Sequence, residues 1–412
     1  MIKPYKIAII DQKGNAGGGI RFAKRLISNF SAYLSKIKID YFGSPQFIKN
    51  SNMNYFNNKN IGINKLNSLT LREEGVLSVQ NSNKIIKQLQ DKFKVKLKYL
   101  PYFYTGDLKK ELEIKLKNYD LALFIWPYLI DIPNINIKKI IVLHDLNFKY
   151  NFGGLSSYNI PETKRLNTQI SQWIKSSEII VTSNFMKKEI KKFYPRVDNK
   201  KIHLIRVGPL TNYKKNHNKN NILKKNNINS NFLLCPTNTK SHKNISNLIN
   251  AFSRIQKNFK NIKLVFCGSG TETINGKISE NKVELSDNQK NVIGLGYVSD
   301  NDLDFLISKA RIVVNTSLYE AGNGSGLDAW YIGTPVAMSN IPPFKEHLSF
   351  LKVKAEIFDP NKPKDIAAKI SKILNYSQSK RFKMIQSSKK NIQKVQWRKI
   401  VNEYYKLILK LL

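Results

Sequence analysis

Residues Leu318–Val336 read LYEAGNGSGLDAWYIGTPV. The run Ile312–Asn315 before this stretch has the apolar character of a short buried strand. Leu327–Ile332 is compatible with a helix that Gly333-Thr334-Pro335 ends. The loop Gly322–Gly326 between them is too rich in glycine to be regular structure. A strand, a glycine-rich loop and a helix in this order form the repeating unit of a parallel α/β sheet, so this stretch decides the fold class.

The same stretch predicts the chemistry of a binding site. A glycine-rich loop at a helix N-terminus exposes unpaired N–H groups at the positive end of the helix dipole, and a phosphate can approach a backbone without Cβ atoms. Glu320 precedes the loop, and Asp328 lies in the expected first turn, where both carboxylates can accept hydrogen bonds from sugar hydroxyls. The matching ligand has a central diphosphate and a hydroxyl-bearing ring at each end. Asp328 also has a second interpretation, because acidic residues favour first helical turns whatever the function.

Strands and helices alternate along the rest of the chain. Lys6–Asp11 is typical of a buried strand, Gly14–Gly19 of a loop, and Ile20–Phe30 of a helix with one apolar face. A second series begins at Phe232, after the Lys- and Asn-rich segment 211–230 that indicates a domain boundary. We therefore expect an α/β protein with two Rossmann-like domains that face a ligand-binding cleft. The expected divisions are residues 1–210, the boundary segment 211–230, a second domain 231–390 and a final helix within 391–412.

The composition is that of a globular protein, with 41% hydrophobic and 11% aromatic residues. The longest apolar run, Leu121–Ile130, contains Pro127 and is too short to span a bilayer. The two cysteines, Cys235 and Cys267, lie in apolar runs and are typical of core residues rather than of a disulfide or metal pair. The first residues read as a strand and not as a signal peptide, so we expect a cytoplasmic protein.

The formal net charge is +40, from 69 Lys and Arg against 29 Asp and Glu. Two interpretations are open: an anionic partner such as a phospholipid surface, or a solvated lysine-rich surface. The segment Asn184–Tyr194 resembles a short amphipathic helix with four lysines, so the protein could rest on the anionic inner face of the membrane. The alternative is that its apolar residues pack on the sheet. The lysines are dispersed and not interleaved with aromatic residues, so no nucleic-acid partner is expected.

Other functional classes are weaker alternatives. A dinucleotide-dependent oxidoreductase requires GxGxxG spacing, which Gly14–Gly19 does not have. A metal-dependent transferase requires an Asp-x-Asp pair. Asp302-Leu303-Asp304 fits that pattern, but it lies at an expected helix start, where acids commonly cap the helix. The alternative outside enzymes is a basic protein that binds nucleic acid or membrane surfaces and has a degenerate nucleotide site.

The opening stretch resembles the acidic signature of glycosyltransferase family 4. The resemblance rests on Glu320, Asp328, Ala329 and the sequence Gly333–Val336, although the family usually has a second Glu and GFGLP-like residues in the loop. Other segments resemble the family in the same order along the chain. These are Ala16–Arg21, His144-Asp145, Pro236–Asn244 with Leu248–Phe252, Leu295–Asp304 and, in the last helix, Trp397.

The resemblance implies the two-domain GT-B fold, with the last helix crossing back to the first domain. It also implies a retaining transfer from a nucleotide sugar, UDP- or GDP-linked, that requires neither a metal ion nor a cofactor. Family members lead us to expect a saccharide or lipid-linked acceptor and a role in cell-surface polysaccharide or lipopolysaccharide synthesis.

Individual roles follow from the same resemblance. Glu320 is expected to hold the donor sugar, Asp328 the ribose, and Lys243 the diphosphate. His144 is expected to contact the sugar near the reaction centre. The remaining donor-side residues are Asn238, Gly324, Ser325, Gly326 and Leu327, with Gly18 and Gly19 in the first domain.

Overall fold

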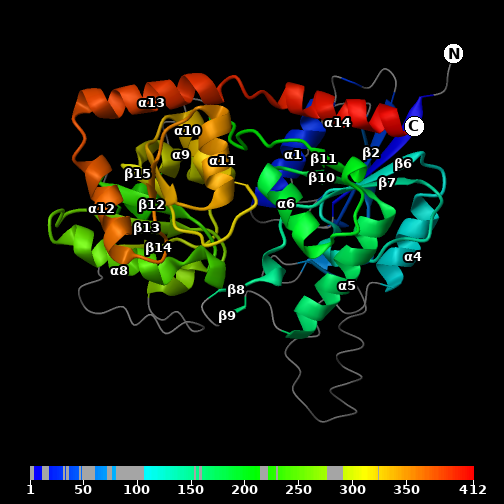
Figure 1. The fold of residues 1–412 in the computed structure, drawn as a ribbon, viewed down its shortest axis with the longest axis horizontal. Helices are drawn as coiled ribbons and strands as arrows, with labels where there is room; N and C mark the ends of the chain where they lie inside the picture. Colours follow the sequence, from blue (N-terminus) through cyan, green and yellow to red (C-terminus); the bar gives the residue numbers. More distant parts are fainter. Residues whose placement is uncertain are drawn as a thin grey trace, which may run out of the picture. The chain divides into compact units, whose positions relative to one another are not determined.

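The computed structural model divides the 412-residue chain into two compact units. Unit 1 comprises Met1–Asp145, Tyr158–Arg206 and Trp397–Leu412, and unit 2 comprises Leu146–Ser157 and Val207–Gln396 (Figure 1). These divisions differ from the predicted ones, since the first domain was expected to run to residue 210 and the second to residue 390. The structure describes residues 4–11, 18–30, 33, 37–45, 48, 61–71, 77–79, 106–152, 155–156, 160–213, 221–228, 231–275, 291–322 and 324–412.

Unit 1 is built on a parallel sheet with the strand order β11-β10-β7-β6-β1-β2-β3. The order reverses between the neighbouring strands β1 and β6. The strands are β1 (Tyr5–Ile10), β2 (Ile37–Gly43), β3 (Ile61–Lys65), β6 (Leu121–Phe124), β7 (Lys138–Val142), β10 (Glu178–Val181) and β11 (Ile202–Leu204). The helices are α1 (Gly18–Phe30), α4 (Gly106–Lys115), α5 (Ile160–Ser176), α6 (Asn184–Phe193) and α14 (Trp397–Leu411). A separate antiparallel pair joins β4 (Leu69–Leu71) and β5 (Leu77–Val79).

The C-terminal helix α14 packs against α1 within unit 1. The ring of Trp397 lies 5.7 Å from that of Phe22, and Tyr404 lies 6.4 Å from Phe30, both edge to face. Tyr404 is buried, and the apolar stripe of α14 that the sequence displays is therefore its packing face.

Unit 2 is built on a second parallel sheet with the strand order β14-β13-β12-β15-β16-β17. Its strands are β12 (Phe232–Pro236), β13 (Lys263–Cys267), β14 (Val292–Gly294), β15 (Ile312–Asn315), β16 (Val336–Ser339) and β17 (Glu356–Phe358). Its helices are α7 (Ile222–Lys225), α8 (Ile245–Gln256), α9 (Asp300–Lys309), α10 (Gly324–Ile332), α11 (Pro342–Leu351), α12 (Pro363–Leu374) and α13 (Gln378–Ile392). The short strands β8 (Asn151–Phe152) and β9 (Leu155–Ser156) form an antiparallel pair.

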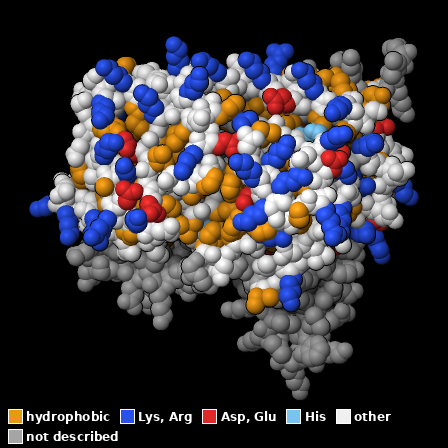
Figure 2. All heavy atoms as spheres, in the orientation of Figure 1, with side chains coloured by type: hydrophobic (Ala, Val, Ile, Leu, Met, Phe, Trp, Pro, Cys, Tyr) orange, Lys and Arg blue, Asp and Glu red, His pale blue; other side chains and the backbone are white. Residues whose placement is uncertain are grey.

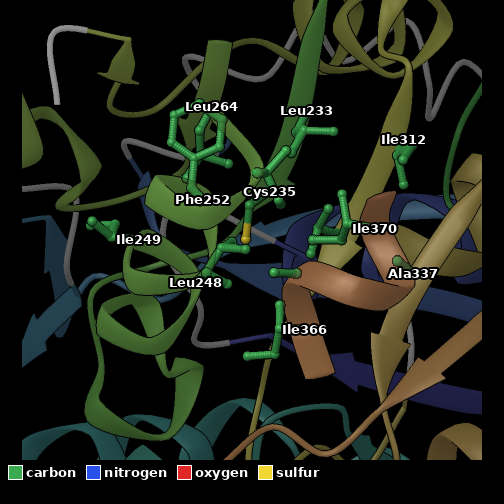
Figure 3. Packing of buried hydrophobic residues seen from close by; sticks show 14 of the residues in the cluster. Leu233, Cys235, Leu248, Ile249, Phe252, Leu264, Ile312, Ala337, Ile366 and Ile370 are labelled. Atoms are coloured by element: carbon green, nitrogen blue, oxygen red, sulfur yellow. The ribbon is translucent and has the colours of Figure 1, made fainter. Parts of the chain in front are cut away.

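Apolar clusters cover both faces of the second sheet. Successive residues of β12 point to opposite sides, so Leu233 and Cys235 lie in one cluster while Phe232 and Leu234 lie in the other. Figure 3 shows residues of α8 and α12 meeting the strand residues of the first cluster. Cys235 and Cys267 are both buried, but in different clusters, which agrees with their predicted place in the core. Burial on both faces explains why these strands read as continuous apolar runs.

The structure corrects the prediction for the opening stretch. Gly322–Gly326 was expected to be irregular, but α10 begins at Gly324. Asp328 therefore lies in the second turn of the helix and not in the first. Gly326 and Leu327 are buried, so tertiary packing outweighs the low helical propensity of glycine at this point.

Two further outcomes concern loops and helices. Residues 14–17 of the predicted loop Gly14–Gly19 lie outside the described residues, whereas Gly18 and Gly19 begin α1. The sequence analysis did not predict α11 and α13. Among the helices that the structure describes, none is both long and apolar enough to cross a membrane.

Candidate functional site

The candidate site lies where the strand order of unit 2 reverses, between β12 and β15. In open parallel sheets, the loops that follow the two strands at such a point diverge and leave room for a ligand. The loop after β12 carries Asn238 and Lys243, and the loop after β15 carries Glu320 and continues into α10. The structure thus brings together residues that are far apart in the sequence.

Lys243 and Glu320 form an ion pair, with 2.5 Å between Lys243 Nζ and Glu320 Oε1. Ser317 Oγ donates a second hydrogen bond, of 2.7 Å, to the same carboxylate oxygen. The side chains of Lys243 and Glu320 are 16% and 20% exposed, so the pair is shielded but accessible. Glu320 Oε2 accepts no hydrogen bond from a residue that the structure describes. One oxygen is therefore held by the protein, and the other can accept a hydrogen bond from a ligand.

Asn244 and Thr316 fix the two loops to each other. Asn244 Nδ2 donates to the carbonyl oxygen of Thr316 at 3.1 Å and to that of Pro360 at 2.7 Å. Thr316 Oγ1 in turn donates to the carbonyl oxygen of Lys243 at 3.1 Å. Asn244 adopts a left-handed backbone conformation with φ of 59°, which asparagine tolerates better than most residues. The sequence analysis gave no role to Asn244, Thr316 or Ser317. An asparagine directly before an apolar helix is a local signal for a helix start, but the side chain of Asn244 joins the two loops and makes no capping hydrogen bond to α8.

The first turn of α10 presents backbone donors. The N–H groups of Gly324 and Ser325 make no hydrogen bond to described residues, as expected for the first residues of a helix. Such groups and the helix dipole attract anions. Asn238 is half-buried, and its Oδ1 accepts a hydrogen bond of 3.1 Å from the N–H group of Lys240, which leaves its amide nitrogen as a donor. This part of the site can therefore donate hydrogen bonds to a phosphate.

Asp328 is engaged by the backbone. Its side chain is fully buried, at 0% exposure, and Oδ1 accepts the N–H groups of Leu210 at 2.7 Å and Thr211 at 2.9 Å. The carboxylate thereby anchors the segment at the start of unit 2 against α10. The resemblance assigned Asp328 to a ribose, but a buried carboxylate with two backbone donors favours an anchoring role.

His144 lies in unit 1, two residues after β7. Its Nε2–H group donates to the carbonyl oxygen of Ile125 at 2.8 Å, and its ring lies 4.7 Å from Trp126 and 5.1 Å from Phe22. These contacts fix the orientation of the half-buried imidazole. At the start of α1, a Cβ added to Gly18 would meet no atom of the described residues within 4 Å, so these residues leave the backbone there open to a ligand.

The Asp302-Leu303-Asp304 motif, which fits the metal-binding pair of a metal-dependent transferase, lies at the capped start of α9. Ser299 Oγ accepts the N–H group of Asp302 at 3.1 Å and donates to Asp302 Oδ2 at 2.7 Å, which makes Ser299 the N-cap of α9. Asp304 is buried within the same helix. Within the described part of the chain, no group of three or more His, Cys, Asp or Glu residues has an arrangement that could hold a metal ion.

Comparison with protein families finds one match, and it covers the segment that carries this site. Residues 218–391 match the family model of glycosyl transferases group 1. The matched segment includes Asn238, Lys243, Glu320 and Gly324–Asp328, but not His144, Gly18 or Gly19. The narrower resemblance to family 4 stays a prediction. No curated protein matches the sequence.

Solved structures extend the likeness to the whole chain. Sucrose-phosphate synthase from Thermosynechococcus elongatus has a TM-score of 0.68 at 17% identity, covering 99% of each chain. WaaG, a glycosyltransferase involved in lipopolysaccharide biosynthesis, has a TM-score of 0.68 at 12% identity, covering 98% of this chain and 99% of that one. Anabaena HepE in complex with UDP-glucose has a TM-score of 0.67 at 14% identity, covering 98% of this chain and 100% of that one. The prediction of a GT-B fold with two parallel α/β domains is thereby confirmed.

Proposed function

We propose that the protein transfers a hexose-type sugar from a UDP- or GDP-linked donor to a saccharide or lipid-linked acceptor. The proposed reaction retains the anomeric configuration and uses neither a metal ion nor a cofactor. One observation carries the proposal. The Lys243–Glu320 pair joins the loops that follow β12 and β15, where the strand order reverses, and the loop after β15 leads into the first turn of α10. These residues lie in the segment that matches the glycosyl transferases group 1 model.

The positive charge in this site suits a diphosphate leaving group. As the bond between the anomeric carbon and the phosphate oxygen breaks, negative charge develops on the diphosphate. Lys243 and the N–H groups of Gly324 and Ser325 would stabilise that charge, with Gly326 and Leu327 in the same turn. The acceptor hydroxyl forms the new bond to the anomeric carbon and gives its proton to the departing phosphate oxygen. These donors supply the charge that a divalent cation supplies in other transferases.

Glu320 would recognise the sugar of the donor, and Asn238 would add a hydrogen-bond donor beside the phosphates. Glu320 Oε2 can accept hydrogen bonds from sugar hydroxyls, and the amide nitrogen of Asn238 can donate one to a phosphate oxygen. In unit 1, we propose that His144 contacts the sugar near the reaction centre, while Gly18 and Gly19 allow the backbone to approach phosphates or acceptor. Asp328 would act indirectly, by anchoring residues 210–211.

Two of the similar structures favour particular partners. HepE is described in complex with UDP-glucose, and WaaG is described as involved in lipopolysaccharide biosynthesis. We therefore propose a UDP-hexose as the first donor to test and a role in cell-surface polysaccharide or lipopolysaccharide synthesis. A lipid-linked acceptor would fit a cytoplasmic protein that binds the inner membrane face peripherally.

The proposal is tested by nucleotide release from a panel of UDP-, GDP- and ADP-sugars. Glu320→Gln should lower kcat/KM at least about a hundredfold, since the ligand-binding carboxylate and the partner of Lys243 are both lost. The matched control is Glu272→Gln, a change at an exposed glutamate of the same unit, which should leave kcat/KM unchanged. Equal activity of both variants would remove the role of Glu320. Failure of every nucleotide sugar to bind or react would count against the proposal as a whole.

A further inference from the structure

Residues 146–157 are an excursion of the chain into unit 2. The residues on both sides of this segment belong to unit 1, yet the segment packs with Val207–Gln396. It contains Leu146 and Phe148, which are buried, and ends in the β8–β9 pair (Figure 1). Its contacts converge on the two loops that carry Lys243 and Glu320.

Tyr319 is the first of these contacts. The N–H group of Leu146 donates to Tyr319 Oη at 3.1 Å, and the ring of Tyr150 lies 5.1 Å from that of Tyr319. Phe152, on the same segment as Tyr150, has its ring 6.2 Å from the ring of Tyr319. Tyr319 is only 6% exposed, so the excursion segment holds it by both a hydrogen bond and ring packing.

His242 is the second contact. The ring of Phe152 lies 5.7 Å from that of His242, which is only 5% exposed. Burial, together with the positive charges of Lys243 and Lys240, lowers the pKa of His242 to about 2. The imidazole is therefore neutral at physiological pH and adds no repulsion to the neighbouring Lys243.

The two contacted residues directly precede the two members of the ion pair. Tyr319 precedes Glu320, and His242 precedes Lys243. The N–H group of Leu318 donates to the carbonyl oxygen of His242 at 2.7 Å, which joins the two loops beneath the excursion segment. Because the residues directly before Lys243 and Glu320 are fixed, these two side chains lose little conformational freedom when they bind a ligand.

We propose that residues 146–152 are a positioning element for the candidate site, with Tyr319 as the positioning residue that fixes the Lys243–Glu320 pair. The effect of this element on catalysis rests on the proposed function. The contacts by which it holds Tyr319 and His242 do not. Tyr319 touches neither donor nor acceptor in this proposal and acts through Glu320.

The test uses two conservative changes in the full-length protein, Tyr319→Phe and Phe152→Leu. Tyr319→Phe removes only the hydroxyl that accepts from Leu146, and the exchange of that amide with solvent should accelerate at least about tenfold. kcat should fall about tenfold with a smaller change in KM, because the pair acts on charge that develops in the transition state. The control is Phe350→Leu at a phenylalanine of unit 2 that is 54% exposed, which should change neither quantity.

Phe152→Leu provides a readout that does not depend on activity. Loss of the ring should open His242 to water and raise its pKa, so its imidazole resonance should titrate between about pH 4 and 7. Comparison with His242→Gln identifies the His242 resonance among those of the five histidines. Thermal unfolding verifies that each variant is folded.

The outcomes separate this inference from the proposed function. If Glu320→Gln is impaired while folded Tyr319→Phe retains wild-type kcat, the positioning role is wrong and the proposed function stands. If the wild-type protein releases no nucleotide, the proposed function fails. The contacts of residues 146–152 are then supported by faster exchange of the Leu146 amide in Tyr319→Phe and by a titrating His242 in Phe152→Leu. They are overturned if both the exchange rate and the titration match those of the wild-type protein.

Discussion

Asp328 is a buried carboxylate whose oxygen Oδ1 satisfies two backbone N–H groups. Replacing it by leucine would leave the N–H groups of Leu210 and Thr211 without their acceptor, at a cost of about 1–3 kcal/mol each. Asp328→Asn keeps an oxygen at the same place. We expect Asp328→Leu to lower the free energy of unfolding of the affected transition by about 3 kcal/mol, and Asp328→Asn by about 1 kcal/mol.

Urea unfolding followed by fluorescence measures this difference, and the transitions of the two units are fitted separately because two-domain proteins need not unfold in one step. Equal destabilisation by the two substitutions would contradict the anchoring role. If Asp328→Asn were stable but failed to bind nucleotide, the ribose contact that the resemblance implied would regain support.

At the level of single residues, the sequence singled out side chains that the structure brings together, but it did not indicate which of them would pair. Glu320 and Lys243 were both singled out, but their ion pair joins residues 77 positions apart and has no local pattern. Tyr319 was missed for the same reason, since its partner Leu146 lies 173 positions away. The position of Asp328 in the second turn of α10 was not predicted, because the helix begins at Gly324, where the packing of Gly326 and Leu327 favours it. Its hydrogen bonds to the N–H groups of Leu210 and Thr211, more than a hundred positions away, have no local pattern either.

At the level of elements, the end of β13 determines the position of the loop after β12. Gly268 has φ of +127°, and a Cβ added there would lie 1.9 Å from the carbonyl oxygen of Thr237. The N–H group of Thr237 donates to the carbonyl oxygen of Cys267 at 2.8 Å, which brings the two strand ends together. Only glycine allows this close approach, and it places Thr237 directly before Asn238 of the candidate site.

Gly268→Ala should therefore strain the backbone and displace Thr237, lowering the free energy of unfolding by about 3 kcal/mol. The control is Gly324→Ala at the start of α10, where the added Cβ would lie 3.8 Å from Cδ1 of the loop residue Leu210, an ordinary van der Waals contact. That change should leave stability equal or slightly higher while weakening donor binding at the start of α10. Chemical unfolding and nucleotide titration measure the two effects. A Gly268→Ala protein as stable as wild type would contradict this account of the strand ends.

Elements with regular apolar spacing were predicted close to the bounds that the structure has: the expected helix Ile20–Phe30 is α1 (Gly18–Phe30), and the segment Asn184–Tyr194 contains α6 (Asn184–Phe193). Helix α13 was missed because only Met384, Ser388 and Ile392 of its fifteen residues are buried, so its sequence is mostly polar and has no clear apolar stripe. Helix α11 was missed although its two initial prolines favour a helix start. The excursion segment has no periodic signal, because its position depends on aromatic residues in distant loops.

At the scale of the whole molecule, the charge of +40 is the property that bears on location. Figure 2 shows Lys and Arg side chains spread over the face in view, with few Asp and Glu between them. Such a field attracts anionic surfaces, and the attraction falls with ionic strength. On α6, Met186 and Ile190 are buried in unit 1, while Phe185 and Phe193 are half-buried. Any membrane contact through α6 would therefore depend more on its lysines than on insertion of apolar residues.

We accordingly predict binding to vesicles that contain phosphatidylglycerol, and not to neutral vesicles, at low salt. Lys188 and Lys192 are exposed on α6, and each lysine near an anionic surface contributes about 1 kcal/mol. Changing both to glutamine should weaken sedimentation with anionic vesicles about thirtyfold, because 2 kcal/mol corresponds to about that factor. Lys383→Gln with Lys390→Gln on α13 removes the same charge from unit 2 and should have a much smaller effect. Equal losses for the two pairs would assign the attraction to net charge alone, and equal binding to neutral and anionic vesicles would exclude an electrostatic membrane contact.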